Sequence, residues 1–248
     1  MLTEGVHEQR MGNPTIEIAY RFEIEGEESE VYRVTLDPVT METLDNGQAE
    51  LPEWTELTFH RCPNCPLESG RWARCPAAAN MVPLIERFNQ LLSFDQIQVV
   101  VLTSERKVFK RTTVQRGVCS LMGLLMASSG CPLTAFFKPM ARFHLPFAST
   151  EETIWRASST YLLAQYFQQG AGRPADLCLQ GLGEIYAQIQ IVNKAFAKRL
   201  RSACRHDSMV NAIILLDMFA KSMPSAIEDS LEEIRHLFLP YLKSSNSI

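Results

Sequence analysis

The sequence predicts an α+β fold, in which antiparallel β-hairpins and a cysteine loop come first and a multi-helix bundle follows. Two observations support this fold class. Segments in which apolar and polar residues alternate lie before residue 113, whereas the chain from residue 149 onward has helical spacing. We therefore expect a disordered leader over 1–13, an α+β part over 14–148, and a helical part over 149–248 that packs with the first part as one unit.

Two hairpins are expected in the first part. The stretch TIEIAYRFEI, residues 15–24, alternates apolar and polar side chains, and after a polar turn containing Gly26 the stretch VYRVTL, residues 31–36, returns. Residues 96–102 and 107–112 form the second hairpin. A turn at Asn46-Gly47 and a short strand over 57–59 lead into the cysteine segment.

The helices are placed by their caps and breakers. Helices are expected over about 77–92 and 113–128, and Gly130 follows the second at the place of a C-cap glycine. Ser149 and Glu152 have capping-box spacing and begin a helix that runs to about residue 169. Further helices are expected from Asp176 to about 203, from Asp207 or Ser208 to about 222, and from Ser225, which with Glu228 repeats the capping-box spacing.

Composition excludes several classes of protein. The hydrophobic content of 46% is typical of globular chains, and no apolar run reaches the roughly 20 residues that span a bilayer. The first residues, MLTEGVHEQR, lack the apolar core of a signal peptide, so we expect a cytoplasmic protein without a membrane segment.

The charge is unevenly distributed along the chain. The total is −4, but residues 1–60 carry −11 and residues 61–142 carry +7. A basic patch for nucleic acid is one interpretation. We favour compensation between acidic strands and the basic middle, because the total is negative and no aromatic residues alternate with the bases as a stacking surface requires.

Four of the seven cysteines are each followed by proline: Cys62, Cys65, Cys75 and Cys131. Proline fixes φ and keeps the preceding residue out of helical conformation, which suits a metal-binding turn. Cys62 and Cys65 form a C-x₂-C pair, the spacing at which one turn presents two thiolates to one ion. The sequence therefore predicts a metal site made of these four cysteines, with zinc as the expected metal.

Several alternatives to a zinc site stay open. Four thiolates also suit an iron–sulfur cluster, although the spacing does not match ferredoxin-type runs. Cys-Pro dipeptides also resemble haem-responsive motifs, His60 is a substitute ligand, and the four cysteines could simply be buried free thiols. Cys119, Cys178 and Cys204 fall in expected helices among apolar neighbours, so we assign them to core packing.

A second candidate site lies in PMARFHLPFAS, residues 139–149. There Arg142 and His144 alternate with apolar residues and could bind an anion or transfer a proton. The same pattern is also explained by a linker whose aromatic side chains pack into the core. A solvated helix face explains a basic cluster near the end of one expected helix, made of Lys194, Lys198, Arg199, Arg201 and Arg205.

Three strings, LPEWTELTFHRCPNCPL, CPAAANM and PMARFHLPFAS, resemble an uncharacterised bacterial family that carries a domain of unknown function. The resemblance implies a bacterial, cytoplasmic protein and supplies no activity, cofactor or partner.

Two functions follow from these patterns. The first is a metal-stabilised structural, sensory or protein-interaction module, since a closed thiolate shell leaves no coordination position for chemistry. Its expected partner is a protein and not a nucleic acid. The alternative is an enzyme with a site around Arg142 and His144 and a structural metal nearby. That alternative needs a cavity lined by His144.

Overall fold

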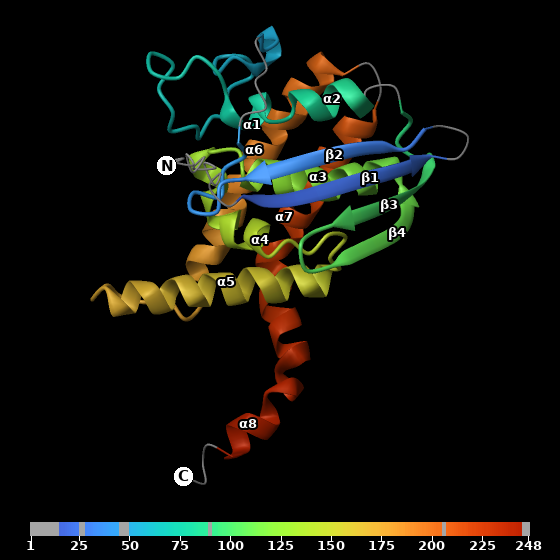
Figure 1. Ribbon diagram of the computed structural model, residues 1–248. Helices are drawn as coiled ribbons and strands as arrows, with labels where there is room; N and C mark the ends of the chain where they lie inside the picture. Colours follow the sequence, from blue (N-terminus) through green and yellow to red (C-terminus); the bar gives the residue numbers. More distant parts are fainter. Residues whose placement is uncertain (1–14, 25–27, 45–49, 89–90, 205–206, 245–248) are drawn as a thin grey trace, which may run out of the picture.

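The computed structural model describes residues 15–24, 28–44, 50–88, 91–204 and 207–244. It has the predicted α+β organisation, with an N-terminal antiparallel sheet followed by a helical region (Figure 1). The expected leader and the turns at Gly26 and Asn46-Gly47 lie outside the described residues.

The sheet has four strands in the order β2-β1-β3-β4, all antiparallel. Both predicted hairpins are present. The strands are β1 (Ile16–Ile24), β2 (Glu30–Leu36), β3 (Gln96–Leu102) and β4 (Lys107–Thr113). Pairing of β1 with β3, in which Tyr20 lies opposite Val101, joins the two hairpins into one sheet.

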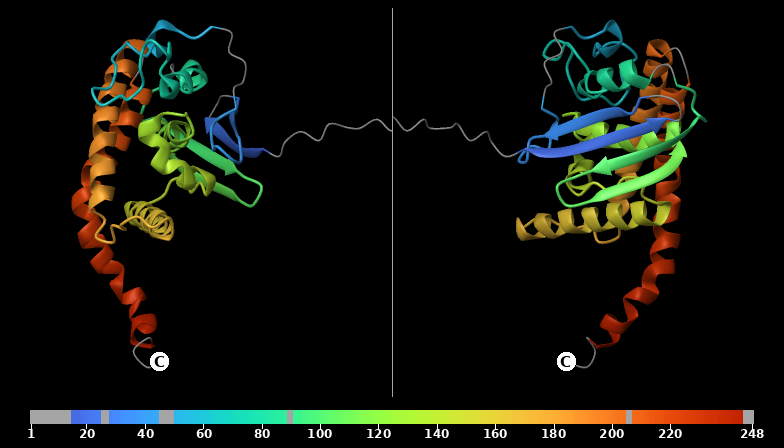
Figure 2. Two further views of the ribbon diagram at one scale, coloured as in Figure 1. Left: turned by 90° about the vertical axis from the view of Figure 1, so that its left-hand side faces the viewer. Right: turned by 45° about the vertical axis from the view of Figure 1, so that its right-hand side comes forward.

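The helices cover one face of this sheet (Figure 2). Alternate β1 residues Ile18, Tyr20 and Phe22 point to that face and are buried, which is the period-two pattern expected of a half-buried strand. The helix α3 (Val114–Ala127) packs against them. A Cβ built at Gly117 would lie 3.0 Å from side-chain atoms of Ile97 and Val99, so the glycine allows the helix to approach the sheet closely.

The remaining helical elements follow the cysteine loop and α3. The capping box of Ser149 and Glu152 is formed as predicted and begins α5. The elements are η1 (Glu53–Thr55), α1 (Pro76–Ala79), α2 (Val82–Phe88), η2 (Pro132–Phe137), α4 (Lys138–Arg142), α5 (Thr150–Gly170), α6 (Gln180–Ala203), α7 (Ser208–Ile234), η3 (Arg235–Leu237) and α8 (Leu239–Ser244).

Three local predictions were wrong. A turn over 57–60 replaces the short strand expected at 57–59, and the helix expected over 77–92 is split into α1 and α2. The helix α7 continues through Ser225, so no cap forms there. Just before this point Ala220 and Met223 of α7 are buried against α5 and α6, and such tertiary packing outweighs weak local stop signals.

The largest core is shared by the sheet and the helical region. Buried residues of β1, β3 and α3 contact Phe196 and Leu200 of α6 and Ile213 of α7. A smaller cluster joins Ile154 and Tyr161 of α5 to α6 and α7. The C-terminal half of α5 extends beyond this cluster, so its side chains after Tyr161 are mostly exposed (Figure 1).

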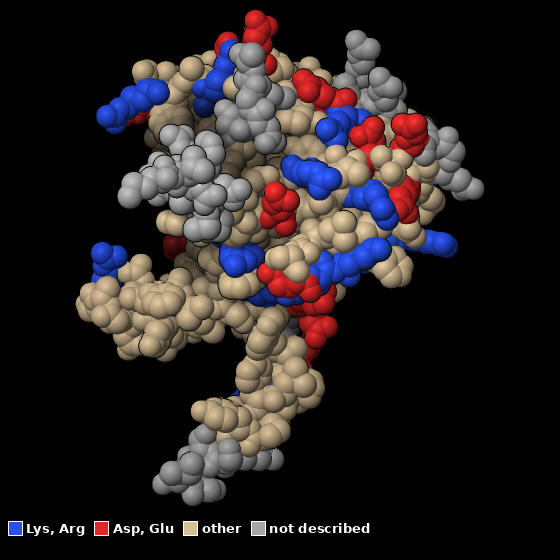
Figure 3. Space-filling view, in the orientation of Figure 1, with Lys and Arg blue, Asp and Glu red and all other residues tan. Residues whose placement is uncertain are grey.

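Charge compensation links the acidic first part to the basic middle of the chain. Lys138 on α4 pairs with Glu42 at 2.8 Å, and Arg87 on α2 pairs with Glu30 at 3.6 Å. Figure 3 shows acidic and basic side chains interspersed over the sheet.

Among the described residues, no single helix has both the length and the apolar content to cross a membrane. The segment Val114–Ala127 together with Pro132–Arg142, bent by 110°, meets the length and composition criteria as a pair.

Candidate metal centre and neighbouring cavity

The cysteine loop is held at its base by backbone pairing. The amide of Cys75 donates to the carbonyl of Thr55 at 2.7 Å, and the amide of Leu57 donates to that of Ala73 at 3.0 Å. Arg74 adds a bond from Nη1 to the Pro52 carbonyl at 2.9 Å. The loop that holds Cys62 and Cys65 is therefore closed at Cys75, directly before α1 begins.

The C-x₂-C pair forms a turn, as its spacing predicts. The amide of Cys65 donates to the carbonyl of Cys62 at 3.0 Å, and Arg61 Nη2 donates to the Cys65 carbonyl at 3.1 Å. Asn64, at the middle of the turn, donates to the carbonyl and side-chain oxygen of Gln188 on α6. These bonds attach the tip of the cysteine loop to the helical region.

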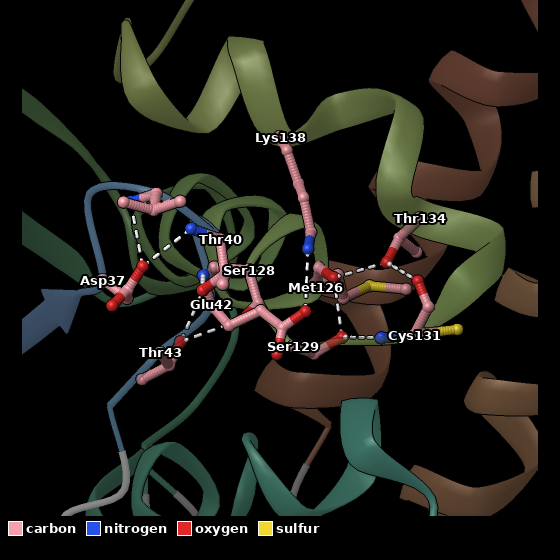
Figure 4. A network of polar contacts seen from close by, with 11 residues as sticks. Asp37, Thr40, Glu42, Thr43, Met126, Ser128, Ser129, Cys131, Thr134 and Lys138 are labelled. Atoms are coloured by element: carbon pink, nitrogen blue, oxygen red, sulfur yellow. Dashed lines mark hydrogen bonds and ion pairs between the residues drawn. The ribbon is translucent and has the colours of Figure 1, made fainter.

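Cys75 and Cys131 occupy the same local structure. Each is the extended N-cap residue of a short helix, α1 or η2, and the following proline is the first helical residue. Ser129 Oγ accepts from the Cys131 amide at 3.3 Å, and Thr134 donates to the Met126 carbonyl at 2.7 Å. The Cys131 sulfur points away from this polar network (Figure 4).

The four Cys-Pro thiols lie close enough to interact electrostatically. Burial raises the pKa of Cys62 to about 12, and the thiols of Cys75, Cys131 and Cys65 add to the rise. Burial also raises the pKa of Cys131. Cys75 and Cys65 raise it further, while the amides of Leu133 and Thr134 lower it. Two segments that are far apart in the sequence thus bring their thiols to one place.

The thiols are neighbours but do not form a closed shell. Across the described part of the chain, no three or more His, Cys, Asp or Glu side chains have the mutual spacing of a formed metal site. Four half-buried thiols on turns and helix starts nonetheless provide the donor set that zinc prefers.

Arg199 of α6 is a buried residue beside the candidate site that the sequence interpretation missed. The sequence places it on a solvated face, but it is only 2% exposed. Its Nη1 donates to the carbonyls of Trp54 and Glu56, the latter at 2.8 Å. Burial lowers the pKa of Arg199, while Cys75, Cys62 and Cys65 act to raise it. A buried cation therefore lies beside the thiols.

The other cysteines differ from one another. Cys119 is buried in α3, and burial raises its pKa to about 12, consistent with core packing. Cys204 follows α6 and is partly buried against the core. Cys178 contradicts the core assignment, because it is exposed in the loop before α6.

His60, the substitute ligand considered from the sequence, contacts α6. Its Nε2 lies 3.3 Å from Ser202 Oγ.

A cavity of about 690 Å³ lies between α3, α4, α5, α6 and α7. His144, from the segment between α4 and α5, lines it. Arg142 is exposed, with its guanidinium 5.5 Å from the ring centre of Phe143, and is not among the lining residues. Arg156 of α5 lines the cavity instead and is close enough to lower the pKa of His144. The structure therefore brings His144 together with Arg156 at the cavity and does not bring Arg142 there.

Comparison with known proteins identifies a family for this chain. The model of a family described as domain of unknown function, DUF6901, matches residues 18–239. The chain belongs to this family. Searches with this chain found no match among curated proteins or solved structures.

In this DUF6901 protein, His144 is part of a short polar chain that ends in the core. His144 Nε2 lies 2.5 Å from the Tyr20 hydroxyl, which lies 2.9 Å from Ser120 Oγ. Ser120 Oγ also accepts from the amide of Phe147 at 3.3 Å. Burial raises the pKa of Tyr20, and burial together with Arg156 lowers the pKa of His144 to about 3. His144 is therefore neutral at neutral pH.

We expect His144 to make the stability of the protein depend on pH. Its folded pKa of about 3 lies below the unfolded value near 6.5, so the unfolded chain binds the proton first. The contribution of neutral His144 to the free energy of unfolding is complete above about pH 6.5. As the pH falls from there towards 3, this free energy decreases by at most about 1.4 kcal/mol per pH unit.

Urea unfolding of the intact protein and of His144→Gln between pH 7.5 and 4.5 measures this contribution. The variant should lose less stability than the intact protein over that range. His236→Gln, at an exposed histidine, is the matched control and should keep the full dependence. Equal slopes for the intact protein and His144→Gln would contradict the assignment.

Proposed function

We propose that this protein is a metal-binding module in which Cys62, Cys65, Cys75 and Cys131 bind one zinc ion. The metal acts as a structural link between the cysteine loop and the start of η2. The observation that carries the proposal is the mutual electrostatic influence of four thiols from two distant segments, all preceding proline. Since four thiolates fill a tetrahedral shell, the role is structural or sensory and not catalytic.

Arg199 adds support, because a tetrathiolate zinc centre carries two uncompensated negative charges. A buried guanidinium next to the thiols offsets part of this charge where water cannot. The amides of Leu133 and Thr134 act in the same direction on Cys131. Zinc binding also fits the reducing bacterial cytoplasm that we propose for the chain, where thiols stay free.

Metal analysis of the purified protein tests the proposal. We expect close to one zinc per chain, and after exchange the intense visible absorption of tetrahedral Co²⁺ thiolate. Cys65→Ser should lower the metal content severalfold or more, because one of four ligands is lost. Cys178→Ser, at the exposed cysteine outside the group, is the matched control and should keep the metal.

Brown protein with iron and sulfide would favour the iron–sulfur alternative. Metal-free protein that rejects both Zn²⁺ and Co²⁺ would end the proposal.

The enzyme alternative is supported by one observation, namely that His144 lines a large cavity with Arg156 nearby. A neutral histidine bonded to a buried tyrosine is suited to proton transfer. In this alternative Arg156, and not Arg142, is the cationic residue of the site. The metal centre then has the same structural role.

A further inference from the structure

The cavity described above has an apolar interior and a small number of polar groups. Its walls are formed mainly by side chains such as Leu124, Phe137, Ile189, Leu216 and Phe219. A volume of about 690 Å³ is within the range of about 300–1,000 Å³ that small-molecule sites occupy. The space suits a largely apolar ligand of small-metabolite size.

Two buried polar side chains on α6 line the cavity without partners. Tyr186 is 5% exposed and Asn193 is 2% exposed. Within the described residues, neither the Tyr186 hydroxyl nor the Asn193 amide makes a hydrogen bond. Their polar atoms are not among the enclosed side-chain atoms that lack a partner, so they remain accessible and can form hydrogen bonds with a ligand in the cavity.

Arg156 places a positive charge at the same part of the cavity. Its Nη2 donates to the carbonyls of Met140 at 2.7 Å and Phe143 at 3.1 Å, which fixes the guanidinium and leaves other N–H groups to donate. Burial lowers its pKa, and the influence of Tyr186 shows that the hydroxyl lies nearby.

The carboxylate nearest in effect to Arg156 is that of Glu152, which also lines the cavity and is close enough to raise the pKa of Arg156. Among the described residues, no carboxylate forms an ion pair with its guanidinium. Glu152, one turn earlier on α5, instead accepts from the Ser149 amide at 2.7 Å as part of the capping box. A guanidinium held in a half-apolar setting favours a bound anion, and its fork of N–H groups matches a carboxylate.

We propose that this cavity binds a small amphipathic carboxylate. Its carboxylate lies beside Arg156 and Tyr186, and its apolar body packs between α3, α6 and α7. Lys110 and Arg116 also line the cavity but are exposed, so Arg156 is its half-buried cation. One guanidinium shielded from water balances one negative charge, which favours a carboxylate over a dianionic phosphate. The inference is independent of the metal centre and gives a ligand class to the cavity that His144 lines.

Calorimetric titration with decanoate, and with decanol as its neutral counterpart, tests the ligand class. We expect saturable binding of one decanoate per chain, at least tenfold tighter than decanol. Arg156→Gln should weaken decanoate binding about tenfold or more and leave decanol unchanged. Arg173→Gln, just beyond the end of α5, is the matched control because Arg173 does not line the cavity.

Tyr186→Phe is a milder second variant, since Arg156→Gln also removes bonds to two carbonyls. It should fold normally and weaken decanoate by severalfold. Equal affinity for decanoate and decanol, no saturable decanoate binding, or full affinity in both folded variants would overturn the proposal. Zinc content should be the same in all of these variants, so failure here is distinguishable from failure of the metal proposal.

Discussion

Chelation of the metal should unfold the cysteine loop while the helices persist. Residues 61–76 contain three prolines and no large buried apolar side chain, so they have little hydrophobic burial to offset the entropy of ordering. A metal that binds only the folded loop supplies that free energy. The helices α6 and α7 have their own buried residues in the main core and do not depend on it.

Hydrogen exchange with and without a chelator measures this effect. We expect protection in residues 61–76 to fall by about 100-fold or more, or roughly 2.7 kcal/mol, with little change in α6 and α7. Cys75→Ser without chelator should reproduce the loss, and Cys178→Ser should not. A loop that stays equally protected after metal removal, or an ion that keeps an exchangeable water, would contradict a structural metal.

Replacement of Arg199 by alanine should cause the largest loss of stability of any single change proposed here. The truncation removes the Arg199 guanidinium that donates to the carbonyls of Trp54 and Glu56, and it leaves a cavity beside the thiols. Each unpaired buried group costs about 1–3 kcal/mol, so we expect a total loss of about 3 kcal/mol or more.

Denaturant unfolding of the metal-loaded protein measures this loss. Lys198→Ala, at the exposed neighbour, is the matched control and should change stability by about 0.5 kcal/mol or less. Arg199→Lys should recover part of the stability and metal affinity, since it keeps the charge but not the paired donors. If Arg199→Ala were as stable as Lys198→Ala, the buried position of Arg199 would be wrong.

Much of the fold follows from short stretches of sequence. Alternation in residues 15–24 determines a strand with Tyr20 and Phe22 on its buried face, and Ser149 with Glu152 determines where α5 begins. These features involve residues a few positions apart, so local conformational preference is sufficient. The Cys-Pro dipeptides belong to the same class, because proline restricts the residue directly before it.

The site was only partly predictable for the same reason. Cys62, Cys65, Cys75 and Cys131 share a local context that selects them from seven cysteines. No local context identifies Arg199 as part of the site, because its hydrogen-bond partner Trp54 lies 145 positions away in the sequence. In the sequence, Arg199 is one of several cations near a helix end, and only packing distinguishes it from exposed Lys198.

The sequence by itself determined the four strands of the sheet, most helix starts and the group of Cys-Pro residues, because each depends on neighbours along the chain. The tertiary structure decided how the hairpins join, that α7 continues past Ser225, and that Arg156 lines the cavity in place of Arg142. These outcomes depend on which surfaces meet in three dimensions. Burial and long-range pairing outweigh local preferences of a few tenths of a kcal/mol per residue.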